Sequence, residues 1–364
     1  MRALVRTVLG IHGVVLAVLG ANLVSFARSR RAAAAPGLRV SVLVPARNEE
    51  DNLRALLPSL LSQRGVDLEV VVVDDASEDG TWAVLQSFAG DRRLVAVRGE
   101  GPPPGWVGKV HALYQATRRA TGGVFVFLDA DAQLRDPDAL ARLVGRWAAN
   151  GGAGTALTGL PRYLDRGPTA LLTSLVPFAV LAALPVPLVP RTASPSLGAL
   201  NGQVWALGAG DYRRLEPHAA VRAEVLEDVM IGRFLKRAGV RLYVEDVSGE
   251  VAVRMYRSFG EAWGGFRKNA YLLGGGRPAP FAAFFALYAL SWVAPSALWL
   301  RGRGGLAPLA TLVAVKLGVD RWARFPLWVS AAAPVSLALG AALQLDSAWA
   351  HARRRVAWKG RRVG

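Results

Sequence analysis

Short apolar runs separated by amphipathic stretches occupy the middle of the chain. The runs lie at 40–45, 68–73, 94–97 and 124–128. Such short runs without polar alternation are typical of parallel strands that are buried on both faces of a sheet. Between the first two runs, leucines recur at helical spacing, at Leu53, Leu56, Leu57, Leu60 and Leu61. This alternation of strand and helix predicts an α/β domain with a parallel sheet.

Three longer stretches near the ends of the chain carry no charged residue, at 7–27, 278–300 and 325–345. Because about 20 residues of helix cross a hydrocarbon core of roughly 30 Å, we expect transmembrane helices at both ends. A shorter stretch at 304–315 precedes Lys316, and it fits a short span, a re-entrant hairpin or an interfacial helix. If all three C-terminal stretches cross the membrane and the central part of the chain is cytoplasmic, the basic tail lies on the outer side and violates the positive-inside rule. The number of C-terminal crossings therefore stays open.

The first uncharged stretch is followed by Arg28, Arg30 and Arg31. Basic residues stay on the cytoplasmic side, so they predict a retained anchor with a cytoplasmic domain after it. A signal peptide is the alternative, because Met1-Arg2 and the alanines at 32–35 resemble a charged n-region and a cleavage site. The anchor interpretation places a multi-pass protein in the cell (inner or plasma) membrane.

Composition restricts the chemistry. The 364 residues include 44 Lys and Arg against 27 Asp and Glu, a formal net charge of +17, and no cysteine. The lack of cysteine excludes disulfides, zinc-thiolate sites and thiol nucleophiles. A basic balance favours anionic partners, and basic residues such as those at 353–355 flank apolar stretches. We interpret them as membrane-surface contacts and expect no nucleic-acid partner.

Acidic residues end two of the predicted strands, Asp74 and Asp75 in one case and Asp129 and Asp131 in the other. Carboxylates beside buried strands need a partner, and hard oxygen ligands suit Mg²⁺ or Mn²⁺ completed by substrate phosphates. Open α/β sheets bind ligands beyond the carboxyl ends of their strands, so the acids predict a cation-assisted nucleotide site, with Lys109 near a diphosphate. Taken singly, a turn-capping Asp75 and a solvated Lys109 are simpler interpretations.

Four motifs follow one another in a particular order. They are Pro-Ala-Arg-Asn-Glu-Glu at 45–50, Val-Asp-Asp-Ala-Ser-Glu-Asp-Gly-Thr at 73–81, Asp-Ala-Asp at 129–131 and Leu-Glu-Asp at 226–228. In this order they resemble the inverting family 2 glycosyltransferases with the GT-A fold, over about 40–269.

Two further motifs narrow this resemblance, Gly-Trp-Val-Gly-Lys at 105–109 and Arg-Met-Tyr-Arg-Ser at 254–258. With apolar stretches on both sides, they are similar to the membrane-bound branch that glycosylates terpenoid lipids and includes hopanoid-associated and carotenoid-acid glycosyltransferases. The resemblance implies a Rossmann-like, mixed but mostly parallel GT-A domain in the cytoplasm, with transmembrane helices at both ends. The implied parts are an anchor at 1–31, the GT-A domain at 32–277, a transmembrane region at 278–346 and a basic tail at 347–364.

The resemblance also implies donor-side roles. The loop after the first strand and the acid that ends the second are expected to hold the nucleoside through Pro45, Arg47, Glu49 and Asp75. Asp131 is expected to bind the metal, with Asp129 on the ribose or a metal-bound water. Lys109 is expected to contact the diphosphate, whose developing charge the ion offsets.

Asp228 is the expected general base, beside Glu227 in the first turn of a predicted helix at 226–238. An inverting transfer needs a carboxylate within hydrogen-bond reach of the acceptor hydroxyl, on the face opposite the departing diphosphate. Favourable charge in the first turn of a helix is the alternative role for both acids.

Candidates for diphosphate or acceptor contact lie around this helix, and they are Gln203, Arg254, Tyr256, Arg257 and Trp263. The polymerising members of the family carry Gln or Arg, two residues and then Arg-Trp; this pattern is missing, which argues against processive polysaccharide synthesis. A proline-rich uncharged segment at 167–190 is expected to dip into the membrane and line a route for a lipid acceptor. An ordinary buried connection is its alternative.

The leading hypothesis is metal-dependent inverting transfer of a hexose from a nucleotide diphosphate sugar, with a UDP sugar as the expected donor. The acceptor is expected to be a hydroxyl or carboxyl of a membrane lipid such as a terpenoid or carotenoid. A polyprenyl-phosphate sugar synthase is the enzymatic alternative, because a phosphate acceptor is already ionised and needs little help from a base. A catalytically silent membrane scaffold is the non-enzymatic alternative.

Overall fold

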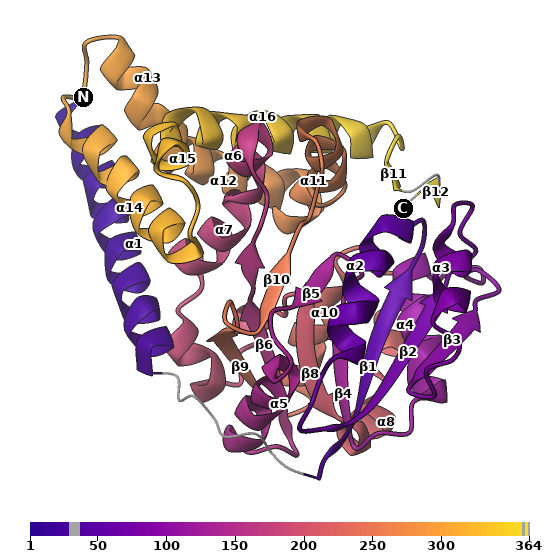
Figure 1. The fold of residues 1–364 in the computed structure, drawn as a ribbon. Helices are drawn as coiled ribbons and strands as arrows, with labels where there is room; N and C mark the ends of the chain where they lie inside the picture. The colour runs from indigo at the N-terminus through magenta and orange to yellow at the C-terminus, as the bar shows by residue number, and fades with distance from the viewer. Residues whose placement is uncertain (29–36, 359–360, 363–364) are drawn as a thin grey trace. The chain divides into compact units, whose positions relative to one another are not determined.

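The computed structural model describes residues 1–28, 37–358 and 361–362 (Figure 1). The chain divides into two compact units. The central unit consists of Arg28–Arg162 and Pro187–Arg254, and the terminal unit of Met1–Ala27, Tyr163–Val186 and Met255–Gly364. This division groups the segments 163–186 and 255–277 with the terminal helices, whereas the sequence assigned them to the catalytic domain.

A seven-stranded sheet forms the centre of the central unit, as far as the structure describes it. Its order is β3-β2-β1-β4-β8-β6-β9, and β8 runs antiparallel to its neighbours β4 and β6 while the other neighbouring pairs are parallel. The strands are β1 (Arg39–Ala46), β2 (Asp67–Asp74), β3 (Leu94–Arg98), β4 (Val124–Leu128), β6 (Thr155–Leu160), β8 (Val204–Gly208) and β9 (Arg241–Asp246). The prediction of a mixed, mostly parallel sheet is confirmed.

Branched aliphatic side chains account for the central strands. Val42 of β1 lies in register with Val70 of β2 and Val126 of β4, and all three are fully buried. Strands that are buried on both faces read as continuous apolar runs, which is why the sequence located them closely. The helices of this unit are α2 (Glu50–Leu61), α3 (Thr81–Ser87), α4 (Gly108–Arg119), α5 (Ala139–Ala149), α8 (Ala209–Leu215), α9 (Pro217–Ala220) and α10 (Glu227–Arg237).

Parallel β1, β2 and β4 bring their carboxyl ends to one edge of the sheet. Ala46 pairs with Asp74, and Leu43 pairs with Phe127. Arg47, Asp75 and Asp129 directly follow the last residues of β1, β2 and β4, and they therefore lie along the same edge of the sheet.

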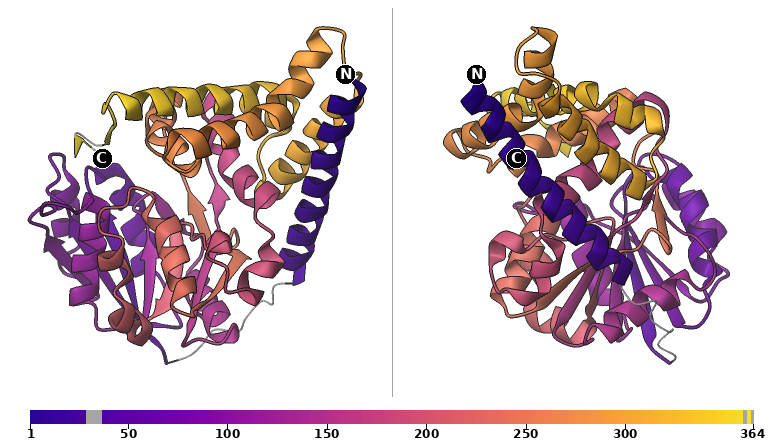
Figure 2. Two further views of the ribbon diagram at one scale, coloured as in Figure 1. Left: turned by 180° about the vertical axis from the view of Figure 1, so that it is seen from behind. Right: turned by 90° about the vertical axis from the view of Figure 1, so that its left-hand side faces the viewer.

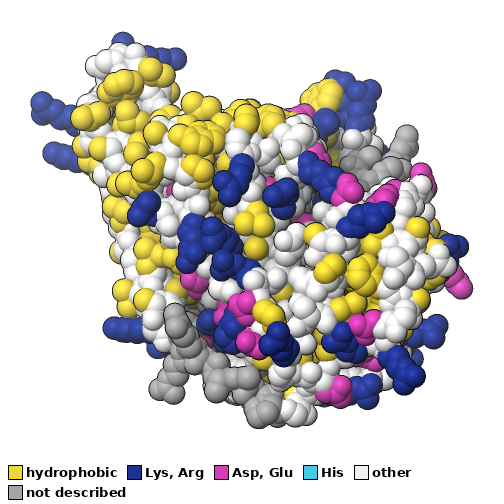
Figure 3. All heavy atoms as spheres, in the orientation of Figure 1, with side chains coloured by type: hydrophobic (Ala, Val, Ile, Leu, Met, Phe, Trp, Pro, Cys, Tyr) yellow, Lys and Arg dark blue, Asp and Glu magenta, His cyan; other side chains and the backbone are white. Residues whose placement is uncertain are grey.

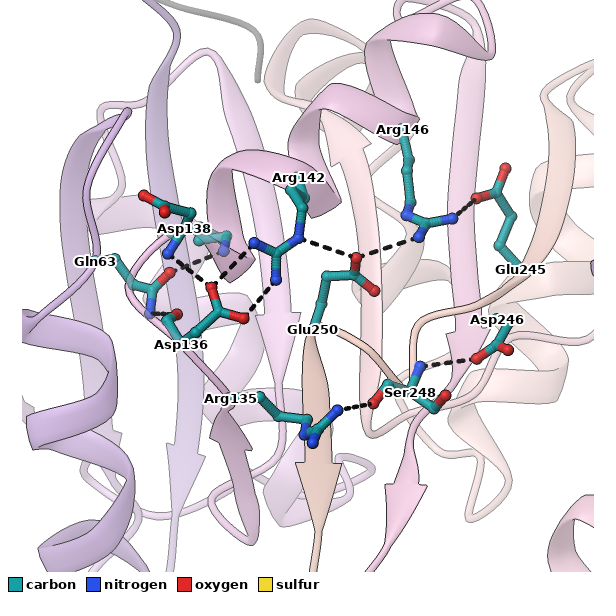
Figure 4. A network of polar contacts seen from close by, with 11 residues as sticks. Gln63, Arg135, Asp136, Asp138, Arg142, Arg146, Glu245, Asp246, Ser248 and Glu250 are labelled. Atoms are coloured by element: carbon teal, nitrogen blue, oxygen red, sulfur yellow. Dashed lines mark hydrogen bonds and ion pairs between the residues drawn. The ribbon is translucent and has the colours of Figure 1, made fainter. Parts of the chain in front are cut away.

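A small antiparallel ribbon continues from Asp131, because β5 (Ala132–Leu134) pairs with β10 (Val251–Val253). An ion-pair network holds the start of β10 (Figure 4). Glu250 Oε1 lies 3.3 Å from Arg142 Nε and 3.2 Å from Arg146 Nη2, and Arg146 Nη1 lies 3.1 Å from Glu245 Oε2. The Glu250 side chain is only 4% exposed, so solvent screens these pairs little. The network fixes the ribbon that leaves the Asp131 turn. A two-residue strand, β7 (Arg162–Tyr163), lies at the boundary of the units.

The terminal unit consists mainly of helices, of which α1 is the longest (Figure 2). They are α1 (Arg2–Arg28), α6 (Ala170–Thr173), α7 (Leu175–Ala183), α11 (Phe259–Leu273), α12 (Pro278–Tyr288), α13 (Ala294–Leu300), α14 (Ala307–Ala323), α15 (Leu327–Ala331) and α16 (Ala333–Ala352). A π-helical turn, Ala289–Val293, joins α12 to α13.

Two helical runs of the described residues, Arg2–Arg28 and Pro278–Leu300, are long and apolar enough to cross a membrane. Hydrophobic side chains also gather on the surface over α13, α14 and α16 (Figure 3). Leu300 of α13 is 76% exposed, and Val335 of α16 is 53% exposed. Apolar exposure of this extent is typical of a surface that meets lipid or another protein.

The third uncharged stretch, 325–345, does not form a single helix. It is divided between α15 and α16, and neither is among the described helices that are long and apolar enough to span. Pro326 precedes α15 and Pro334 lies at the start of α16. Proline opens a helix readily but does not continue one, so the chain breaks here.

Lys316 does not interrupt α14. Its Nζ donates to Ser174 Oγ at 2.9 Å and pairs with Asp320, which also accepts a 2.9 Å hydrogen bond from Ser330 Oγ. Both charged side chains are fully buried, and their pairing offsets the cost of removing them from water. The sequence treated this lysine as a break because it could not show these partners.

A buried carboxylate, Glu69 of β2, joins three segments at the end of the sheet opposite Asp75. It accepts hydrogen bonds from Ser41 Oγ, from Thr121 N at 2.8 Å and from Thr121 Oγ1 at 2.7 Å. Burial raises the pKa of Glu69, but the hydrogen bonds from Ser41 and Thr121 outweigh burial and lower the pKa below its usual value. A lowered pKa contributes stability above the unfolded pKa of about 4.3, which is lost as the pH falls through the folded pKa.

Glu69→Ala should therefore lower the free energy of unfolding at neutral pH by about 1–3 kcal/mol, because buried donors lose their acceptor. Denaturant unfolding in detergent, followed by tryptophan fluorescence, measures the change. The difference from the wild type should shrink in acid, where the carboxylate is protonated. Asp67→Ala on the same strand is the control, because that side chain is 69% exposed. Equal losses for both variants would contradict this role of Glu69.

Candidate functional site

The loops after β1 and β2 are hydrogen-bonded to each other. Arg47 Nη1 donates to the backbone oxygens of Asp75 and Ala76, each at 2.8 Å, and Asp75 N donates to Ala46 O at 2.7 Å. Asn48 and Ala76 have φ angles of 52° and 54°, so both loops turn sharply after their strands. The contact fixes the backbone on both sides of Asp75.

Pro45 lies at the end of β1, and Glu49 lies on the loop that follows it. Pro45 is in register with Val73 of β2, and Glu49 N donates to Thr81 Oγ1 at 2.8 Å. The four residues predicted to hold a nucleoside, Pro45, Arg47, Glu49 and Asp75, thus lie at the end of β1 and on the adjoining loops after β1 and β2.

His111 lies near this group, and sequence analysis missed it. Burial lowers the pKa of His111, and the charge of Asp75 opposes that shift, so the imidazole is within electrostatic range of the carboxylate. Trp106 contacts the same imidazole edge-on, with ring centroids 5.3 Å apart, and Tyr114 lies 5.1 Å from Trp106. A lone histidine in a helix carries no sequence signal that would have located it here.

Lys109 connects the end of β4 to the start of α10. Its Nζ lies 2.7 Å from Asp129 Oδ1 and 2.9 Å from Glu227 Oε1. The Lys109 side chain is 32% exposed and the Glu227 side chain 12% exposed, so the pairs are only partly screened by water. The structure therefore brings together three residues that the sequence assigned to separate tasks.

Asp228 is held by backbone donors beside this lysine. Its Oδ2 accepts from Gly202 N at 3.2 Å and its Oδ1 from Val229 N at 2.8 Å. Burial and the charge of Glu227 raise the pKa of Asp228 to about 6, against the opposing charge of Lys109. A carboxylate with such a pKa is ionised at neutral pH and is still basic enough to take a proton.

The pKa of Lys109 reflects the same group of charges. Burial lowers it, but Asp129 and Glu227 outweigh burial and raise the pKa of Lys109 well above its usual value. The lysine stays charged at any physiological pH. One ammonium group therefore faces three carboxylates, Asp129, Glu227 and Asp228, which leaves an acidic excess.

The Asp129–Asp131 turn is fixed by backbone hydrogen bonds. Asp129 N donates to Gln203 O at 3.3 Å, and Arg254 N donates to Asp131 O at 3.2 Å. Gln203 is only 6% exposed, and its Nε2 has no hydrogen-bond partner among the residues that the structure describes. Two predicted contact residues, Gln203 and Arg254, thus adjoin the predicted metal-binding turn through their backbones.

Tyr256, Arg257 and Trp263 belong to the terminal unit. Tyr256 N donates to Asp165 Oδ1 at 3.0 Å, and Trp263 Nε1 donates to Asp346 Oδ2 at 2.8 Å. Arg257 N donates to Glu261 Oε2 at 2.9 Å, near the start of α11. Their roles in acceptor or diphosphate contact remain predictions.

The carboxylates fit a hard divalent ion that arrives with its substrate. Across the described residues, no three Asp, Glu or His side chains converge closely enough to hold a metal ion by themselves. Mg²⁺ normally takes one or two protein carboxylates and completes its shell with water and substrate phosphates. Asp131, two residues after Asp129, carries a carboxylate, which is an oxygen ligand of this kind.

Residues 41–180 match the family model for glycosyl transferase family 2. The chain is 26% identical over 220 residues to a 4,4'-diaponeurosporenoate glycosyltransferase of Staphylococcus haemolyticus, covering 60% of this chain and 57% of the relative. It is 27% identical over 234 residues to the protein of the same name from Staphylococcus aureus strain MRSA252, covering 62% and 59%. The match thus spans less than two thirds of the length of these relatives.

Among solved structures, the fold is similar to that of a mannosyltransferase from Pyrobaculum calidifontis, solved in complex with GDP-Man and Mn²⁺. The TM-score is 0.53 with 23% identity, over 93% of this chain and 99% of that one. The sheet, the acidic edge (the edge at which Asp75 and Asp129 follow their strands) and this likeness define a fold of the GT-A class. The part of the chain that matches the family 2 model, 41–180, thus belongs to a domain that is similar to the family 2 glycosyltransferases.

Lys109→Met should lower the free energy of unfolding at neutral pH by about 1.5–3 kcal/mol, because Asp129 and Glu227 lose a charged hydrogen-bond donor. Denaturant unfolding of both proteins measures the loss. Arg118→Met in the same helix is the control, since that side chain is 69% exposed and its pair with Glu216 spans 3.7 Å. A Lys109→Met protein as stable as the control would show that the lysine does not hold the carboxylates together.

Proposed function

We propose that the protein is a metal-dependent inverting glycosyltransferase of the membrane. It transfers a hexose from a nucleotide diphosphate sugar, a UDP sugar, to a hydroxyl or carboxyl of a terpenoid or carotenoid lipid. The convergence of Asp129 and Glu227–Asp228 on Lys109 carries the proposal, because it joins the donor turn to a residue able to act as base. The names of the relatives, which are glycosyltransferases for a carotenoid-derived acid, support the acceptor class.

The nucleoside is assigned to the loops after β1 and β2. Asp75 accepts hydrogen bonds from the base or the ribose, beside Pro45 and Glu49. Arg47 donates to the backbone oxygens of Asp75 and Ala76 and so keeps the loop in shape. A carboxylate is suited to an imide N–H or a hydroxyl, because it offers acceptors only.

Asp131 would hold the divalent ion, and Asp129 would contact the ribose or a water on that ion. Bound Mg²⁺ or Mn²⁺ would offset the negative charge that develops on the leaving diphosphate. Lys109 adds a cationic group that is already held in place by Asp129 and Glu227. A fixed cation stabilises developing charge without reorganising at the moment of reaction.

With a hydroxyl acceptor, Asp228 acts as the general base. It takes the proton of the acceptor hydroxyl while the acceptor oxygen bonds to the anomeric carbon and the bond from that carbon to the diphosphate breaks. The N–H groups of Gly202 and Val229 orient its two oxygens. Glu227 is paired with Lys109 and therefore sets the charge around the base.

The acceptor is assigned to the membrane side. Two helical runs of sufficient length and apolarity, at Arg2–Arg28 and Pro278–Leu300, support a membrane protein. The basic residues that follow the first run assign the catalytic domain to the cytoplasmic side. The segment 167–190 contacts the lipid, and Gln203 donates to a sugar or acceptor oxygen. Arg254, Tyr256, Arg257 and Trp263 are the further candidates for contact with diphosphate or acceptor.

Purified protein in detergent with lipid acceptor should release UDP from a UDP sugar only when Mg²⁺ or Mn²⁺ is present. Asp131→Asn should reduce turnover by orders of magnitude and leave thermal stability close to that of the wild type, because the change removes a metal ligand. Chromatography of the extracted lipid reports the product. A neutral glycolipid supports the proposal, whereas an acid-labile sugar phosphate supports a polyprenyl-phosphate sugar synthase. No turnover with any nucleotide sugar would refute both.

The pH profile of kcat/KM should rise with pH through about 6, because Asp228 must be ionised to accept a proton. Asp228→Asn should lower kcat by about 10²–10⁴-fold. Its stability at neutral pH should not fall, since a carboxylate with a raised pKa destabilises the fold once it ionises. An Asp228→Asn enzyme with normal turnover would remove the base assignment.

A further inference from the structure

One face of α10 carries Asp228, Gly232 and Lys236 at intervals of four residues. Side chains at this spacing lie above one another on a helix. Each of the three contacts a different part of the segment 187–203, which we call the strap. The strap belongs entirely to the central unit and includes the short turn Pro195–Leu197.

Lys236 attaches the beginning of the strap. Its side chain is buried at 3% exposure, and its Nζ donates to Val189 O and to Thr192 O, each at 2.6 Å. Burial lowers the pKa of Lys236, since desolvation disfavours the ammonium form. A buried ammonium is tolerated only where acceptors replace water, so the two carbonyl groups and the lysine depend on each other.

Two glycines bring the strap and the helix into backbone contact. A Cβ added to Gly198 would lie 2.7 Å from Gly232 O, and a Cβ added to Gly232 would lie 2.9 Å from Ala199 N. Neither position has room for a side chain without a backbone shift. The register between strap and helix is therefore fixed by the absence of side chains at both positions.

The end of the strap reaches the predicted base. Gly202 N donates to Asp228 Oδ2 at 3.2 Å. The preceding residue, Asn201, is held on β6, because its N donates to Thr158 Oγ1 and its Nδ2 to Gly159 O, both at 2.9 Å. Gly202 also approaches Lys109, whose Nζ would lie 3.2 Å from an added Cβ. Contacts of Asn201 with β6 and the close approach of Lys109 therefore position the Gly202 N–H that donates to Asp228.

We propose that the strap positions the Asp228 carboxylate for proton transfer and that Lys236, about two helical turns along α10, is the positioning residue that fastens it. The inference rests on the proposed function, in which Asp228 is the base. Lys236 itself touches no reacting atom. It acts through Gly198, Gly232 and Gly202, whose N–H group orients one oxygen of the base and favours its ionised form.

The chemistry of the strap also suggests what it responds to. Its first four residues, 187–190, are also the end of the proline-rich segment 167–190 that is assigned to the lipid acceptor, and Leu188 is 47% exposed. A change at the start of the strap reaches the base through the three contacts on α10.

Lys236→Met tests the proposal, with Arg237→Met as the matched control because Arg237 is the next residue of the same helix and is exposed. Lys236→Met should lower kcat on the order of 10- to 100-fold, the scale expected when a catalytic group is slightly misplaced. KM for the UDP sugar should stay unchanged. The acid limb of the pH profile should move to higher pH, because Asp228 loses a hydrogen bond that favours its charged form. Arg237→Met should match the wild type.

Gly198→Ala provides a second variant that leaves the lysine intact, and Gly210→Ala is its control because a Cβ there meets nothing within 4 Å. Gly198→Ala should reproduce the loss of kcat and the shift of the acid limb. A purely structural role for Lys236 would instead lower the melting temperature without moving the pH profile. Unchanged pH profiles in both Lys236→Met and Gly198→Ala would overturn the proposal.

Hydrogen–deuterium exchange separates this proposal from the proposed activity. Amides of 198–204 should exchange faster in Lys236→Met than in the wild type, while amides of β1 and β2 should not change. Faster exchange in a protein without glycosyltransferase activity would support the strap and refute the proposed function. Unchanged exchange in an active enzyme would refute the strap alone.

Discussion

The acidic side chains of the central unit can approach one another because a single ammonium group lies between them. Lys109 Nζ is 2.7 Å from Asp129 Oδ1 and 2.9 Å from Glu227 Oε1. Carboxylates gathered without a cation would repel one another and raise each other's pKa. Asp129 follows β4, Glu227 lies at the start of α10 and Lys109 lies at the start of α4. The positive charge of one segment therefore offsets the negative charges of two others. The turn that we propose for the donor and the helix that carries the proposed base are thereby electrostatically coupled.

This arrangement gives Asp228 two kinds of control. Charge acts through Glu227, which raises its pKa, and through Lys109, which opposes that shift. Geometry acts through Gly202, whose N–H holds one oxygen and whose own position depends on the strap. A base needs both a suitable pKa and a fixed direction toward the proton that it takes. On the proposed mechanism, residues far along α10 therefore affect a reaction that they do not touch.

The sequence predicted four of the seven strands described in the sheet, β1 to β4, because strands buried on both faces leave uninterrupted apolar runs such as 124–128. It also predicted that acids at strand ends would meet at one edge, since parallel strands share an edge. It did not predict the contacts among them, because no local pattern encodes the pairing of Lys109 with Glu227. The strap was missed for a similar reason, as Gly198 and Gly232 are distant in the chain and a glycine alone indicates only a possible close approach. Near the C-terminus, hydropathy suggested a span at 325–345 where prolines divide the helices.

The account depends on one claim, that the acidic edge around Asp131 and Lys109 holds a divalent ion together with a nucleoside diphosphate. Electron paramagnetic resonance of Mn²⁺ titrated into the purified protein, with and without UDP, measures this directly. The account predicts weak Mn²⁺ binding to the protein alone and much tighter binding when UDP is added, because the substrate phosphates complete the coordination shell. Mn²⁺ binding that is unaffected by UDP, or that persists unchanged when Asp131 is replaced by Asn, would contradict it.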